Sequence, residues 1–113
     1  MTEFPIRTTS SGAVVVLPTG HLNMAAAPAF RTQLHTLVAS GSTRLVIDLS
    51  AVDSIDSSGL GALISGLKAT RLADGDLRIA APTPQVKVAL ELTNLDRVMQ
   101  SYDVADEAFD APD

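Results

Sequence analysis

The sequence contains no cysteine and only two histidines among its 113 residues. Disulfide bonds, thiolate metal sites and a cysteine nucleophile are therefore excluded. The two histidines, His21 and His35, fall on different predicted elements, so no metal-ligand spacing is present and no metal site is expected. The absence of cysteine fits a reducing compartment, although many exported proteins lack cysteine too.

Positive charge is also scarce, with 8 Lys and Arg against 13 Asp and Glu and a formal net charge of -5. Without a basic cluster the chain is poorly suited to bind nucleic acids or anionic membranes, because binding to either depends on cationic side chains. No apolar run reaches the ~20 residues that span a bilayer. The first residues, MTEFPIRTT, lack the apolar segment of a signal peptide. These absences predict a cytoplasmic protein that neither binds nucleic acid nor inserts directly into a membrane.

The length and apolar content predict one domain. The 113 residues are enough for one compact domain and too few for two ordinary ones. An apolar fraction of 46% can supply a core without disulfide or metal cross-links. We expect a single domain over residues 1–113, with residues 110–113 frayed.

Five short runs have the composition of strands. They are residues 4–9, 13–17, 44–49, 77–81 and 97–99. The triplet Ser10-Ser11-Gly12 predicts that the first two runs form a hairpin. The second run is continuously apolar and rich in valine, which places it inside the sheet.

Four segments have helical signals. They are residues 25–39, a helix from Ser57 or Ser58 to 73, residues 84–94, and a short segment after Asp103 that buries Val104, Ala108 and Phe109. Pro28 suits the first turn of the first helix, and Gly41 suits the position just past its end. Thr83 followed by Pro84 is typical of an N-cap and a first helical residue. Asp103 is expected to cap the last helix.

The predicted order is β-β-α-β-α-β-α-β-α. A strand pair followed by strands that alternate with helices is typical of an α/β domain with a mixed, mostly parallel sheet. We expect about five strands and about four helices. Right-handed crossovers place the helices on one face of the sheet or on both.

The stretch DSIDSSGLGAL, residues 53–63, joins a buried strand to a helix. In an open α/β sheet, functional sites gather at the carboxyl ends of strands, and the loop at residues 18–24 is another such end. One interpretation is purely structural. The serines and aspartates would cap the helix, and Gly59 and Gly61 would allow it to pack closely on the sheet.

The other interpretation is a site that receives negative charge. Glycine in a helix costs ~1 kcal/mol relative to alanine, so the bare backbone favours close approach by a partner. A phosphate on Ser57 or Ser58 would add about -1.5 to -2 charges. The helix N-terminus would tolerate that charge, whereas Asp53 and Asp56 or a packed partner would oppose it.

The stretch DSIDSSGLG resembles the signature of the STAS domain of bacterial anti-sigma factor antagonists. Two flanking segments extend the resemblance over nearly the whole chain. Residues 15–23 resemble the family's Val-x-Leu-x-Gly-x-Leu-Asp segment, and LTNLDRVMQSY, residues 92–102, resembles its Leu-Thr-Gly-Leu-Asp-Arg-Val stretch. The order of predicted elements is also that of the family.

The resemblance implies a regulatory protein and not an enzyme. Such antagonists bind an anti-sigma factor that is also a serine kinase, and binding frees the sigma factor. The kinase then uses its own ATP and Mg²⁺ to phosphorylate the serine before Gly-Leu-Gly, here Ser58, and a phosphoserine phosphatase restores the antagonist. The chain itself would carry no cofactor. The expected partner-binding residues are Asn23, Asp53, Asp56, Ser57, Ser58, Gly59, Leu60 and Gly61.

Two positions qualify what the resemblance implies. The spacing alone does not choose between the two serines; the family pattern selects Ser58 and leaves Ser57 as a structural residue. The family usually has aspartate where this chain has Asn23, and glutamate is common where it has His21. Asparagine keeps the hydrogen-bonding shape but loses the charge, which bears on kinase recognition.

Other functions remain as alternatives. A Gly-x-Ser-x-Gly nucleophile elbow is absent around Ser58, and nothing completes a catalytic triad with His21, so no catalytic residue is expected. The main alternative is a STAS scaffold that does not switch. Such a domain would serve as an accessory subunit of a stress-sensing complex or of a lipid or anion transporter.

Overall fold

The computed structural model describes residues 3–109. Its main sheet has five strands in the order β1-β2-β4-β6-β7. The strands are β1 (Ile6–Thr8), β2 (Val14–Val16), β4 (Arg44–Asp48), β6 (Asp76–Ala80) and β7 (Ser101–Tyr102). Among the described strands of this sheet only the β1–β2 pair is antiparallel, so the predicted mixed and mostly parallel sheet is confirmed, with β2 inside it.

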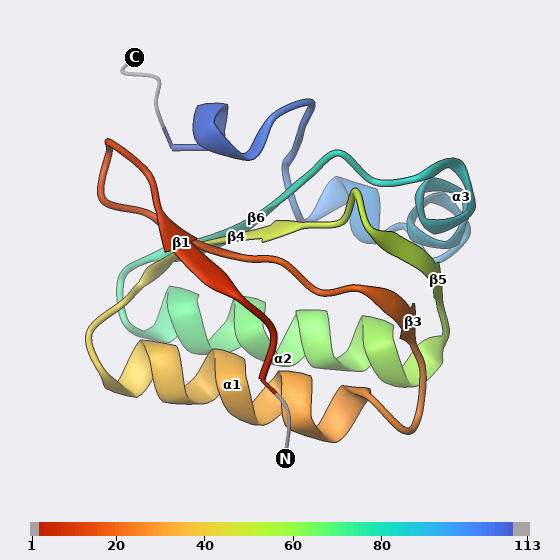
Figure 1. The fold of residues 1–113 in the computed structure, drawn as a ribbon, viewed down its shortest axis with the longest axis horizontal. Coiled ribbons are helices and arrows are strands. Elements are labelled where there is room, and N and C mark those ends of the chain that lie inside the picture. Colours follow the sequence, from red (N-terminus) through yellow and green to blue (C-terminus); the bar gives the residue numbers. More distant parts are fainter. Residues whose placement is uncertain (1–2, 110–113) are drawn as a thin grey trace.

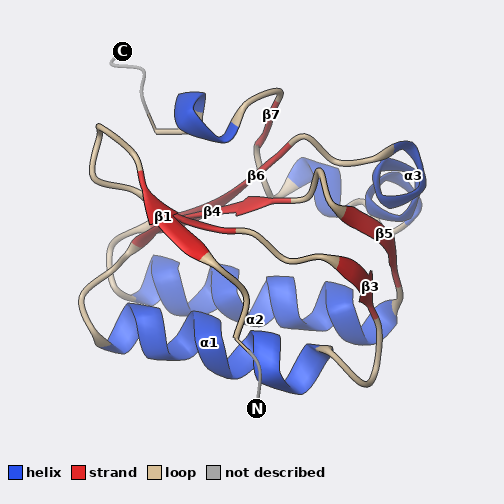
Figure 2. Ribbon diagram, in the orientation of Figure 1, coloured by secondary structure: helices blue, strands red, loops and turns tan. Residues whose placement is uncertain are grey.

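Residues 3–109 form three α-helices and two short 3₁₀ helices. They are α1 (Ala27–Ala39), α2 (Ser57–Leu72), α3 (Pro84–Leu92), η1 (Leu95–Arg97) and η2 (Ala105–Glu107). Helices α1 and α2 lie side by side on one face of the main sheet and run in the same direction (Figure 1). The segment that contains η2 lies on the opposite face (Figure 2).

A second, two-stranded sheet pairs β3 (Gly20–Leu22) with β5 (Val52–Ile55) in parallel. The sequence prediction missed both strands. They are short, and β5 carries the polar residues Asp53 and Ser54, so neither shows the alternation that predicts a strand. Because α1 follows β3 and α2 follows β5, the two helices begin at the same end of the molecule (Figure 1).

The core has a large and a small part, one on each face of the main sheet. Along β4, Leu45 and Ile47 face the α1–α2 layer, and Val46 faces the other way, as the two-residue period of a strand requires. On the second face, Ala105 and Ala108 cover Val46 and its neighbours. Packing in the larger part of the core thus fixes the positions of α1 and α2 on the sheet.

The C-terminal part of the prediction needs correction. Residues 97–99 are not a strand: the chain there leaves the η1 turn, which Asn94 opens with a left-handed φ of 60°, and the strand begins at Ser101. The last helix is a single 3₁₀ turn with Val104 as its N-cap and no side-chain capping bond from Asp103. Val104 is 49% exposed, because Ala105 and Ala108 face the sheet in its place. The predicted fraying of residues 110–113 lies outside the described residues.

The capping prediction for α3 was also wrong in its chemistry. Thr83 occupies the N-cap position, but its side chain does not cap the helix. Its hydroxyl donates to the carbonyl oxygen of Val52 at 2.9 Å. Thr83 therefore ties the start of α3 to β5.

A buried glutamine on α1 holds the start of the chain. The Gln33 side chain donates from Nε2 to the Phe4 carbonyl oxygen at 2.8 Å and accepts from the Phe4 backbone N–H at 3.1 Å. The Phe4 ring then packs edge-on against Phe30, with 5.7 Å between ring centroids. This polar pair fixes the segment that leads into β1.

Gln33→Met tests this connection. Methionine keeps the length of the side chain but removes both hydrogen bonds, so the free energy of unfolding should fall by about 1–2 kcal/mol. Urea denaturation followed by circular dichroism measures the change. The exposed Gln85 on α3 provides the matched control, and Gln85→Met should stay within about 0.5 kcal/mol of the parent. Equal effects of the two substitutions would contradict the role given to Gln33.

Candidate functional site

Asp56 caps helix α2. Its Oδ1 accepts hydrogen bonds from the backbone N–H of Ser58 at 2.9 Å and of Gly59 at 3.1 Å. Its own backbone N–H donates to the carbonyl oxygen of Leu22 on β3, at 3.2 Å. The side chain that caps α2 is thus the aspartate and not either serine, so the cap does not account for the hydroxyl of Ser58.

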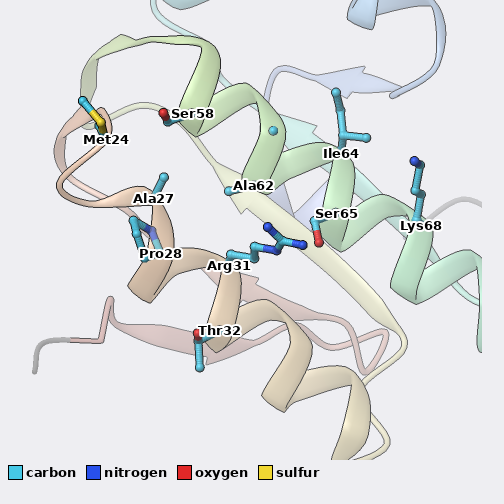
Figure 3. Close-up of a pocket in the computed structure, with 11 residues that line it drawn as sticks. Met24, Ala27, Pro28, Arg31, Thr32, Ser58, Ala62, Ile64, Ser65 and Lys68 are labelled. Atoms are coloured by element: carbon cyan, nitrogen blue, oxygen red, sulfur yellow. The ribbon is translucent and has the colours of Figure 1, made fainter.

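Ser58 lies at the mouth of a groove between α1 and α2. The groove has a volume of 680 Å³. Its lining residues are Met24, Ala27, Pro28, Arg31, Thr32, Ser58, Gly61, Ala62, Ile64, Ser65 and Lys68, and Figure 3 shows the labelled ones. Ser58 is half-buried in this wall, whereas Ser57 is exposed at the start of the same turn. The structure therefore gives the two neighbouring serines different surroundings.

The charge of the groove is opposite to that of the whole chain. Its only charged lining residues, within the described part of the chain, are Arg31 and Lys68. The carboxylates of the turn, Asp53 and Asp56, are exposed outside the groove. A chain with a formal net charge of -5 thus presents a cationic groove beside Ser58.

The loop at residues 20–24 lies next to the α2 turn through the small sheet. Asn23 is exposed, and its Oδ1 accepts from the backbone N–H of Ala25 at 3.0 Å and of Ala26 at 3.2 Å. An aspartate oxygen would accept the same two bonds, so asparagine preserves the loop and removes only the charge. His21 pairs with Ser54 on β5, with 2.7 Å between Nδ1 and Oγ. The histidine considered as a base for Ser58 is therefore bonded to a different serine.

The two glycines of the turn have different surroundings. Gly59 is buried, and a Cβ there would overlap the carbonyl oxygen of Leu22 and lie 2.7 Å from Cγ1 of Ile55. A Cβ on Gly61 would meet no atom within 4 Å. Gly59 thus allows the helix to pack on β3, as the structural interpretation requires. Gly61 leaves the groove wall open, and packing does not explain it.

The predicted partner-binding residues divide in the same way. Asn23, Asp53, Asp56, Ser57 and Gly61 are exposed, and Ser58 is half-buried on the groove. Gly59 and Leu60 are buried, and Leu60 is part of the main core. Gly59 and Leu60 therefore support the turn from the core side and contribute no exposed surface for a partner.

The sequence prediction missed the α1 side of the site. Arg31 comes from the predicted first helix and lines the groove. Met24, which is 74% exposed, lies in the loop at residues 18–24 that the sequence indicated as a functional end of the sheet. The position of Arg31 depends on how α1 is rotated against α2, which only the packed core determines.

Two further findings concern metal binding and membrane-spanning helices. Within residues 3–109 there is no cluster of three or more His, Asp or Glu side chains that would hold a metal ion. None of the helices that the structure describes is long and apolar enough to cross a membrane.

This α/β architecture is that of a known class. The STAS domain family matches residues 5–108, and the chain belongs to that family. A protein of Thermotoga maritima, described as an anti-sigma factor antagonist, is 33% identical over 98 residues, which cover 86% of this chain and 87% of the relative.

Solved structures agree with this assignment. The crystal structure of a Thermotoga maritima anti-sigma factor antagonist has a TM-score of 0.86 at 32% identity and covers 93% of this chain and 90% of its own. A Mycobacterium paratuberculosis anti-sigma factor antagonist gives 0.78 at 30% identity, covering 93% and 88%. The unphosphorylated form of the anti-sigma factor antagonist SpoIIAA, at 22% identity, shares the fold with a TM-score of 0.81, covering 95% and 93%. The Bacillus protein SpoIIAA in its phosphorylated form gives 0.73 at 21% identity, covering 95% and 96%.

Alanine at each of the two glycines should separate packing from surface. Gly59→Ala should lower the free energy of unfolding by about 2 kcal/mol, because the new methyl group overlaps β3. Gly61→Ala should raise it by up to about 1 kcal/mol, because alanine favours the helix and the space is open. Urea denaturation of the two variants beside the parent measures both changes. A destabilised Gly61→Ala variant would contradict the open groove wall.

Proposed function

We propose that this protein is an anti-sigma factor antagonist that is switched by phosphorylation of Ser58. The observation that carries the proposal is the placement of Ser58. Its backbone is capped by Asp56, and its side chain lies on the rim of an open groove. Relatives at 30% identity or more that are described as anti-sigma factor antagonists support the same role.

In the unphosphorylated form the protein binds an anti-sigma factor and so frees the sigma factor. The contact surface comprises the exposed residues of the turn, the loop that carries Asn23 and Met24, and the α2 side of the groove. The anti-sigma factor is a serine kinase that supplies ATP and Mg²⁺, and this chain is its substrate. Because the reaction needs ATP, the protein acts in the cytoplasm.

The switch is a phosphoryl transfer. A bond forms between Oγ of Ser58 and the γ-phosphorus of ATP, the bond from that phosphorus to ADP breaks, and the hydroxyl proton passes to a base on the kinase. The product carries about -1.5 to -2 additional charges at the contact surface. A partner that packs on the turn is repelled, and a phosphoserine phosphatase reverses the change by hydrolysis.

The fold tolerates the modification for an electrostatic reason. Ser58 lies in the first turn of α2, where the helix dipole favours negative charge. The groove beside it provides room for the phosphate without displacing the core. Both the unphosphorylated and the phosphorylated forms of SpoIIAA share the overall fold of this chain.

Capture from lysate of the source cells tests the proposal with three baits: the parent protein, Ser58→Ala and Ser58→Asp. The parent and Ser58→Ala should retain a kinase-type anti-sigma factor, identified by mass spectrometry. Ser58→Asp should bind the purified partner about tenfold more weakly, because its carboxylate lies in the contact surface and repels the partner. With labelled ATP the partner should phosphorylate the parent and not Ser58→Ala.

Ser57→Asp provides the matched control, since it adds the same charge one residue away. It should bind more tightly than Ser58→Asp. If all four proteins retain the same partner equally, or if they bring down a transporter subunit, the domain is a scaffold that does not switch. Equal weakening by the two aspartates would place the effect in the general charge of the turn and not at Ser58.

A further inference from the structure

Arg31 on α1 and Ser58 on α2 line the same groove. The axial register of the two helices can be read from a hydrogen bond farther along, where Nε2 of His35 and Oγ of Ser65 are 2.6 Å apart. The helices run in the same direction, and Arg31 precedes His35 by one turn, so its Cα lies about one turn, or ~5 Å, beyond the level of Ser58. The side chain extends from α1 into the space between the helices (Figure 3). This step is measured along the helix axes. Across the groove, Arg31 and Ser58 line the same cavity, so the guanidinium group and a phosphate on Ser58 would share it.

The guanidinium group of Arg31 is available for such a contact. Three other arginines form ion pairs with carboxylates: Arg7 with Asp106, and both Arg71 and Arg78 with Asp76. Over residues 3–109, Arg31 has neither an ion pair nor a side-chain hydrogen bond. The groove that it lines contains no described carboxylate that would compete for it.

We propose that Arg31 binds the phosphate of phosphorylated Ser58 across the groove between α1 and α2. The biological relevance of this inference rests on the proposed phosphorylation of Ser58. A guanidinium group suits the role because it donates two parallel hydrogen bonds to phosphate oxygens. Lys68 lies ten residues after Ser58, about 15 Å farther along the helix, and contributes only a distant charge.

This contact determines where the phosphate group points. The phosphate is drawn into the mouth of the groove, away from Asp53 and Asp56 on the exposed turn. The modification then occupies the groove and engages Arg31 at once, so an acidic side chain of a partner can no longer use either.

Phosphoserine inserted at position 58 by an expanded genetic code tests the inference without any kinase. The ³¹P NMR signal of the phosphate is followed through a pH titration, whose midpoint lies near 6 for a free phosphoserine. The three proteins compared are the parent, Arg31→Gln and Arg97→Gln, each with phosphoserine at position 58. Arg97 is the matched control, because it is an exposed arginine on η1 that does not line the groove.

A nearby guanidinium cation favours the dianionic phosphate and lowers the midpoint, so its removal must raise it. Arg31→Gln should raise the midpoint by about half a pH unit or more, after allowance for solvent screening. Arg97→Gln should leave it unchanged. In the parent, the Nε–H signal of Arg31 should shift when position 58 changes from serine to phosphoserine. Circular dichroism and the backbone amide spectrum verify that each variant is folded.

Coinciding midpoints for the parent and Arg31→Gln would overturn the inference. An equal rise in Arg97→Gln would overturn it as well, since the effect would then be one of net charge. Neither result depends on whether a kinase acts on the protein, because the phosphate is inserted during translation. Failure to capture a kinase would count against the proposed function and leave this measurement unaffected.

Discussion

The close seating of helix α2 on strand β3 is the constraint on which the rest of the site depends. Gly59 lets the first turn of the helix approach the carbonyl oxygen of Leu22, and the backbone N–H of Asp56 donates to that same oxygen. The carboxylate of Asp56 then binds two of the free N–H groups at the helix start. Because these hydrogen bonds hold the backbone on both sides of Ser58, the backbone determines where Ser58 lies. The groove exists because α1, which follows β3, begins at the same end of the sheet (Figure 1).

The small β3–β5 sheet has a role that its length hides. It carries Leu22 and Val52, which face the main core, and it brings the loop with Asn23 beside the turn that starts at Asp56. Thr83 ties α3 to the same sheet through Val52. The loops that follow β3, β5 and β6 are thereby all held by the small sheet, which is separate from the main sheet. A site built on this small sheet is positioned by hydrogen bonds of both strands and does not depend on a mobile loop.

The sequence predicted the elements that have strong local signals and missed those that depend on distant contacts. The hairpin, the buried β4 and the C-terminal end of α1 were predictable from Ser10-Ser11-Gly12, from a continuous apolar run, and from Gly41. Helix α1 begins at Ala27, two residues after the predicted start. By contrast, β3 exists because it pairs with residues about thirty positions later, and no property of GHL alone indicates that pairing. Residues 97–99 looked like a strand because they are partly apolar, yet the turn at Asn94 delays the strand to Ser101.

The site shows the same division. The serine turn was recognisable because its residues are consecutive and its spacing is typical of a helix start. The choice of Ser58 over Ser57 needed the family pattern, and the structure adds that the two differ in exposure. The cationic wall opposite Ser58 was not predictable, because Arg31 is one of several polar residues on an amphipathic helix. Which of them faces α2 is decided by the packing of Phe30 and Leu34 in the core.

A rigid site restricts how a phosphate can act. A modification shifts a conformational equilibrium only if it interacts differently with the two states. The turn of α2 is fixed by Asp56, Gly59 and the β3 carbonyl, and the core beneath it is closed. Within the described residues nothing in this turn suggests a second backbone arrangement that a phosphate would favour. If Ser58 is phosphorylated as proposed, the free energy of the added charge would be expressed at the surface, in the repulsion of a partner and in the reorientation of exposed side chains such as Arg31. On the proposed function, the phosphorylated domain would signal through a change in what it binds and not through a change of fold.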